Sequence, residues 1–393
     1  MTDLETPVAT PPRASPLRRA APALLGYAAV RALGLVALAV WSAANGKSAH
    51  TLLSARWDSL WYTRVAELGY SYEVRLPNGD VHANLAFFPL LPWLERLVSA
   101  VTPLSYADAG LLVTAVASLA AAWGIFAVAG HVHGRRAGVC AVLVWAVLPV
   151  GIVQSMAYSE SLFTALAAWS LYAVLTGRWL TAGLLAALAG LTRPVGVAVV
   201  AALWVAAITS FVGEHRRDGS TPWRDGARAW RRALAMIIAP LGAAGYVLWV
   251  GHRTGKGPLG YLDVQAGWRN GFDGGYAFAR FVAEKFTSFP SALAGVALIV
   301  GVALIMWLYV TCVRQGQPPA LLVYTGVVVA LALCASSYFG SKPRLLLPAF
   351  PLLLPLATAL ARLRTSRSVL VLGSVAVASA VYGAFWLNGS GPP

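Results

Sequence analysis

Eleven long runs of apolar residues alternate with polar segments along this chain, and most are long enough to cross a bilayer as a helix. They predict membrane spans at residues 22–44, 107–130, 137–155, 159–176, 179–192, 194–212, 233–251, 291–313, 320–338, 345–361 and 368–387. The run at 179–192 is short and fits a partial or re-entrant helix. The pattern therefore predicts an all-α polytopic membrane protein in one domain, residues 19–393, behind a Pro-rich disordered tail at 1–18.

The composition agrees with this class, because 58% of the residues are hydrophobic and only 11% are charged. A net charge of +15 would suit a nucleic-acid partner, but its distribution argues for membrane topology instead. Segments on the side of the N-terminus carry +11, and those on the other side carry +3. Since Lys and Arg collect in cytoplasmic loops, we expect a cytoplasmic N-terminus in a cell membrane, with the lipid bilayer and no nucleic acid as partner.

Two long segments, residues 46–106 and 252–290, lie on the less basic side, which we call the outer face. The first has a helical apolar spacing over 57–66. A turn sequence at 77–80 predicts a hairpin between 72–76 and 81–85. The aromatic run 87–94 predicts a helix lying at the membrane interface. We therefore expect the first outer loop to be structured.

Polar residues gather at the outer ends of the predicted spans, where an ionisable group is costly unless it is paired or functional. The clusters contain Arg56, Trp57 and Asp58; Glu160; Arg193; Gln265, Trp268 and Arg269; and Lys342 and Arg344. A carboxylate can accept a proton from a sugar hydroxyl, and cations can hold a phosphate leaving group. These residues therefore favour sugar transfer from a lipid-linked phosphate. No residues have metal-ligand spacing, so we expect no metal and no other cofactor.

Each candidate also has a purely structural interpretation. Asp58 is at a position to cap the helix that follows it, and Glu160 to cap a span or pair with an arginine. Arg193 precedes a proline and can satisfy freed carbonyl groups, and the cations Lys342 and Arg344 can extend to the membrane interface.

The order of several motifs resembles the PIG-V family. These motifs are Arg56-Trp57-Asp58-Ser59-Leu60-Trp61-Tyr62, Ala86-Phe87-Phe88-Pro89, Tyr158-Ser159-Glu160-Ser161, Leu191-Thr192-Arg193-Pro194 and Lys342-Pro343-Arg344-Leu345. The resemblance implies the GT-C architecture, a polyprenyl-phosphate sugar donor and inversion at the anomeric carbon. It also implies that Asp58 is the catalytic aspartate, which acts as general base. The expected function is mannosyl transfer to a lipid or glycan acceptor at the outer face. The alternatives are a GT-C transferase of arabinofuranose or glucose, and a lipid flippase or transporter.

Overall fold

The computed structural model describes residues 15–217 and 222–391 of the chain. Most of the predicted tail, residues 1–14, lies outside this part. Helix α1 already begins at Pro16, so the predicted tail boundary at residue 18 is too late. In α1 the Ser15 side chain accepts a hydrogen bond from the backbone of Arg18, and a proline occupies the first helical position, which is a common way to start a helix.

Six helical segments of the described residues are long and apolar enough to span a membrane. They are α1 (Pro16–Ala44), α5 (Tyr106–His133), Pro194–Gly213 in η3 (Pro194–Gly196) and α9 (Val197–Arg217), Ala229–Thr254 in α10 (Pro222–Ile238) and α11 (Leu241–Thr254), α14 (Ser291–Arg314) and α18 (Thr365–Asn388). The chain is a multi-pass membrane protein.

The other five of the eleven predicted spans are shorter or broken in the structure, and the short helix expected at 179–192 is one of them. They correspond to α6 (Arg135–Ala146) with η2 (Gly151–Ser155), α7 (Ser159–Leu175), α8 (Trp179–Gly190), α15 (Pro319–Cys334), and α16 (Lys342–Leu345) with η6 (Phe350–Leu353) and α17 (Leu354–Arg362). In the last of these spans, the helical segments Phe339–Leu345 and Phe350–Arg362 meet at a bend of 77°. Prolines interrupt two of these runs, at Pro149 and at Pro348, and a window of apolar composition does not register such breaks.

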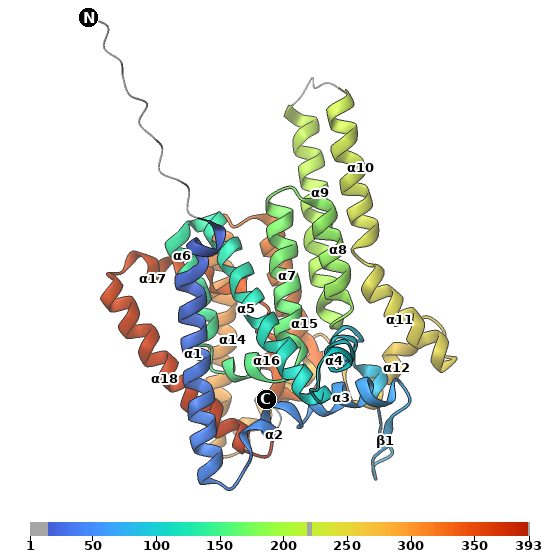
Figure 1. Cartoon of the computed structure of the whole chain (residues 1–393), viewed down its shortest axis with the longest axis vertical. Coiled ribbons are helices and arrows are strands. Elements are labelled where there is room, and N and C mark those ends of the chain that lie inside the picture. Colours follow the sequence, from blue (N-terminus) through green and yellow to red (C-terminus); the bar gives the residue numbers. More distant parts are fainter. Residues whose placement is uncertain (1–14, 218–221, 392–393) are drawn as a thin grey trace, which may run out of the picture.

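The two outer segments form small elements at one end of the helical bundle, opposite the hairpin of α9 and α10 (Figure 1). The first contains α2 (Ala49–Ser54), α3 (Asp58–Leu68), β1 (Glu73–Arg75), β2 (Val81–Ala83), η1 (Asn84–Ala86) and α4 (Leu90–Val101). The second contains α12 (Gly260–Gly267), β3 (Gly271–Phe272), α13 (Tyr276–Glu284) and η4 (Lys285–Thr287). Strand β3 pairs with β4 (Ala335–Ser336), just before η5 (Phe339–Ser341).

The local predictions for the first outer loop are confirmed in outline. The helix expected over 57–66 is α3, and the predicted turn joins β1 to β2 in an antiparallel hairpin with Val74 opposite His82. The helix expected from residue 87 begins three residues later, at Leu90, because Pro89 stands at its cap, and its place at the membrane interface stays a prediction. Together these elements form a compact cover over the outer ends of α5 and α7.

Arg31 in α1 shows how a charge is accommodated within a membrane span. Its two terminal nitrogens donate to the carbonyl oxygens of Ala146 and Gly151, at the break between α6 and η2. A helix break in a membrane leaves backbone carbonyls without partners, and the guanidinium satisfies two of them. Arg31 therefore has a structural role at this break.

Candidate active site

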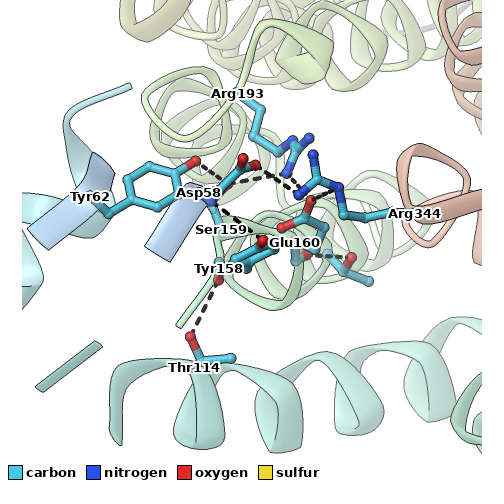
Figure 2. A network of polar contacts seen from close by, with 9 residues as sticks. Asp58, Tyr62, Thr114, Tyr158, Ser159, Glu160, Arg193 and Arg344 are labelled. Carbon is cyan, nitrogen blue, oxygen red and sulfur yellow. Dashed lines mark hydrogen bonds and ion pairs between the residues drawn. The ribbon is translucent and has the colours of Figure 1, made fainter. Parts of the chain in front are cut away.

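Asp58 lies at the start of α3 and points toward Arg344, which comes from the short helix α16 (Figure 2). Its Oδ2 accepts a hydrogen bond from Arg344 Nη1 at 2.8 Å, and its backbone N–H lies 3.4 Å from the hydroxyl of Tyr158. The N-cap of α3 is Trp57, whose side chain makes no capping bond, and Asp58 is the first helical residue, so Asp58 does not occupy the capping position. Among the described residues the side-chain hydrogen bond of Asp58 is made through Oδ2, so Oδ1 is free to accept a proton.

The backbone just before Asp58 is strained. Trp57 has φ +51° and ψ −124°, a region that residues other than glycine rarely occupy. Such a conformation costs about 1–3 kcal/mol and persists only where the surroundings impose it. This strained turn lies between α2 and α3 and directs the Asp58 side chain toward Arg344.

Glu160 is the second carboxylate of the site. It lies in the first turn of α7, and only 2% of its surface is exposed. Its Oε1 lies 3.3 Å from Arg344 Nε and also forms an ion pair with Arg193 Nη1. Of the two structural interpretations, pairing with an arginine is therefore confirmed. Arg344 bridges the two carboxylates, so two guanidinium groups and two carboxylates form one cluster.

Arg193 enters this cluster from the break between α8 and η3. Its side chain is 14% exposed, and Nη1 also donates to Ser159 Oγ at 3.2 Å. Ser159 in turn shares a hydrogen bond of 2.7 Å with the Tyr62 hydroxyl. Burial raises the pKa of Tyr62 above its ordinary value, so this hydroxyl stays protonated. Arg193 thus contacts the side chains of Glu160 and Ser159, so the alternative interpretation, in which it only satisfies carbonyl groups, is wrong.

Two aromatic residues, Tyr62 and Tyr158, belong to the cluster but were not predicted as site residues. The Arg344 guanidinium lies 5.0 Å from the centre of the Tyr158 ring, within the range of a cation–π contact. Tyr62 is one helical turn from Asp58 in α3, and Tyr158 precedes Ser159 and Glu160 directly. Their positions beside predicted residues were the available signal.

Lys342 is close to Arg344 in sequence but lies outside the cluster. Its Nζ donates to the carbonyl oxygens of Ala332 and Ala335, at 2.8 Å each, where α15 ends. Cations commonly satisfy the last carbonyl groups of a helix in this way. The structure therefore places Lys342 at a helix terminus rather than beside Asp58.

Arg56 and Trp57 also face away from Glu160. The Arg56 guanidinium covers the Trp57 ring at 4.0 Å and donates to the carbonyl oxygens of Leu387 and Gly389, at 3.3 and 3.5 Å. These contacts attach the segment before Asp58 to the end of α18. The contacts of both residues therefore stabilise the turn before Asp58.

The remaining predicted residues join the two outer segments. Gln265 donates to the Ala86 carbonyl at 3.4 Å, and Trp268 Nε1 donates to the Ala83 carbonyl at 3.0 Å. The Trp268 ring also stacks on His82, and Arg269 forms a 2.6 Å ion pair with Asp80 at the hairpin turn. None of the contacts of these three residues reaches Asp58 or Glu160.

Several solved structures have a fold similar to that of this chain. ArnT from Cupriavidus metallidurans bound to undecaprenyl phosphate matches with a TM-score of 0.50 at 17% identity, over 86% of this chain and 62% of that one. The fold is that of the GT-C glycosyltransferases. Apo ArnT gives 0.49 at 15% identity, over 83% and 68% of the two chains. The archaeal oligosaccharyltransferase AglB from Archaeoglobus fulgidus, in complex with an inhibitory peptide and a dolichol-phosphate, matches with a TM-score of 0.46 at 12% identity. The match covers 93% of this chain and 56% of that one.

The chain thus spans only about three fifths of the length of the ArnT chain in that complex and of AglB. In sequence, residues 82–227 match the family model for dolichyl-phosphate-mannose-protein mannosyltransferase. No curated protein matches the chain. The family match covers well under half of the sequence, and the PIG-V resemblance stays a prediction.

Proposed function

We propose that this protein is a membrane glycosyltransferase that moves a mannosyl residue from a polyprenyl-phosphate donor to a lipid or glycan acceptor. The observation that carries the proposal is the cluster of Asp58, Glu160, Arg193 and Arg344. Segments from four distant parts of the chain bring these residues together at one end of the bundle. Buried charges are expensive, so such a concentration favours a functional site over a structural one.

In the proposed reaction Asp58 is the general base. Arg344 holds Oδ2, and the open Oδ1 takes the proton from the acceptor hydroxyl as that oxygen attacks the anomeric carbon. The bond from this carbon to the donor phosphate breaks on the opposite side, and the configuration inverts. The leaving polyprenyl phosphate carries away the electron pair. The guanidinium groups of Arg193 and Arg344 stabilise its charge.

Glu160 would orient both arginines. One buried carboxylate oxygen facing two guanidinium groups fixes their spacing before the donor arrives. Pre-arranged donors stabilise a developing charge more effectively than donors that must first reorganise. Glu160 is thus a positioning residue in this mechanism, and Asp58 alone accepts the proton.

Two findings support the donor class. The family model matched by residues 82–227 is named for dolichyl-phosphate-mannose, which favours mannose over arabinofuranose or glucose. The solved ArnT complex contains undecaprenyl phosphate, which favours a polyprenyl carrier. The charge asymmetry of the loops supports an outward-facing site in the cell membrane, because helix α3, which begins with Asp58, lies at the end of the bundle opposite the α9–α10 hairpin (Figure 1).

The deciding experiment is a transfer assay with purified protein. Polyprenyl-phosphate-mannose and a membrane lipid extract are supplied, and mannosylated products are identified by mass spectrometry. Parallel reactions use polyprenyl-phosphate-arabinofuranose and polyprenyl-phosphate-glucose. Transfer of mannose alone supports the proposal. Transfer of arabinofuranose or glucose alone would make that sugar, and not mannose, the one the enzyme moves. If no donor is consumed, the enzymatic function is contradicted.

A further inference from the structure

An apolar groove of about 480 Å³ runs along the outside of the bundle between α4, α5, α7 and α8. All the residues that line it are apolar, among them Leu94, Val98, Val116, Leu162 and Leu166. Its wall on α5 belongs to a membrane-spanning helix, and Val116 is 61% exposed there. The groove therefore opens toward the hydrocarbon of the bilayer, where an aliphatic chain is the available occupant.

The size of the groove also favours a chain over a protein helix. An α-helix is about 10 Å across with its side chains, so a volume of 480 Å³ accommodates roughly one turn of it. A single aliphatic chain is much thinner and fills the same volume over several carbon–carbon bonds. A transmembrane partner would leave most of its length outside.

The outer end of the groove adjoins the candidate active site. Leu162 lines the groove and packs with Tyr62 and Ala117 in one apolar cluster. The hydroxyl of Tyr62 bonds to Ser159, which contacts Arg193. A chain in the groove would therefore place its polar head beside α3, the helix that begins with Asp58.

The position of Tyr62 indicates which substrate the groove serves. In Figure 2 Tyr62 and Arg344 lie at opposite ends of the cluster, with Asp58 between them. An inverting transfer needs the leaving phosphate and the attacking hydroxyl on opposite sides of the sugar. If the guanidinium groups of Arg193 and Arg344, which lie next to each other in Figure 2, hold the phosphate, the acceptor approaches from the side of Tyr62.

We propose that the acceptor is a membrane lipid whose aliphatic chain occupies the groove between α4, α5, α7 and α8. This inference rests on the function proposed above and specifies its acceptor. The donor chain then lies elsewhere, and the two lipids reach Asp58 from different sides.

The first test compares two acceptors that differ only in their chain, octyl mannoside and methyl mannoside, with polyprenyl-phosphate-mannose as donor. Each methylene group moved out of water contributes about fourfold in affinity, so octyl mannoside should have a KM at least about tenfold lower. Val116→Trp should fill the groove and remove this advantage, while transfer to methyl mannoside continues. Val377→Trp is the matched control, because Val377 is 54% exposed on α18, away from the groove.

Retention of the full chain-length advantage in Val116→Trp would overturn the proposal, as would equal KM values for both acceptors in the unmodified protein. The second test needs no transfer and so separates this proposal from the proposed function. An octyl mannoside with a diazirine in its chain should label residues 112–120 and 162–169, and unlabelled octyl mannoside should compete. Uniform labelling of all lipid-facing helices, or displacement by polyprenyl phosphate, would contradict an acceptor site here.

Discussion

Replacing Asp58 by Asn separates a catalytic carboxylate from a structural one. Asn keeps the shape of the side chain, and its carbonyl oxygen can still accept a hydrogen bond from Arg344. The Asp58 side chain is 26% exposed, and Arg344 keeps its second partner, Glu160. Because Arg344 is nearly buried but keeps one carboxylate partner, loss of the Asp58 charge should lower the free energy of unfolding by about 1–3 kcal/mol.

The catalytic effect should appear in the transfer rate. Loss of a general base lowers the rate by roughly a hundredfold or more, which corresponds to about 2.7 kcal/mol in the activation free energy. We expect Asp58→Asn to fold, to bind donor with a near-normal KM, and to lose kcat by that factor. The assay measures mannosyl transfer from polyprenyl-phosphate-mannose under saturating donor, beside the thermal midpoint of the same preparation.

Asp80 offers a matched control. Its side chain is 22% exposed and forms an ion pair with Arg269, in the same outer loop. Asp80→Asn removes a comparable charge, and we expect its transfer rate to remain near that of the unmodified protein. A folded Asp58→Asn protein with transfer within about threefold of Asp80→Asn would refute the role of Asp58 as base.

Three further predictions concern other parts of the molecule. Arg193→Gln should raise the donor KM about tenfold or more through loss of a charge-assisted contact, whereas Lys342→Gln should lower the thermal midpoint and leave the donor KM unchanged. Burial raises the pKa of Glu95, a fully buried carboxyl on α4, so its contribution to stability is present at low pH and lost as the pH rises above the ordinary carboxyl range. Glu95→Gln should therefore raise the thermal midpoint at neutral pH and flatten the dependence of that midpoint on pH. An unchanged pH profile would contradict this. Cysteines at positions 80 and 270 should react with an impermeant reagent on intact cells, and one at position 178 should not; the reverse pattern would invert the topology.

Much of the site could be predicted because polar residues at the ends of apolar runs are unusual. Asp58, Glu160, Arg193 and Arg344 were all recognised in this way, and the structure brings them into contact. Lys342 carried the same signal but belongs to another environment. Residues two positions apart on a helix point about 200° apart, so Lys342 and Arg344 cannot face the same partner.

Other features depend on contacts between distant segments and could not be predicted. Arg31 finds its partners at Ala146 and Gly151, far along the chain, and both are backbone carbonyls that any residue type supplies. The groove likewise arises from four separate helices and has no local sequence pattern. The number of full-length spans was overestimated because apolar composition does not reveal where a helix bends.

The cancellation of charge within the cluster has a consequence for how the donor is captured. Two guanidinium groups and two carboxylates produce little field beyond their immediate surroundings, and a neutral cluster does not attract an anion over long distances. Capture would then depend on lateral diffusion of the lipid within the bilayer, followed by an exchange of partners once the phosphate is in contact. In that case the rate of donor association should vary little with ionic strength, in contrast to enzymes that draw soluble anions from bulk water.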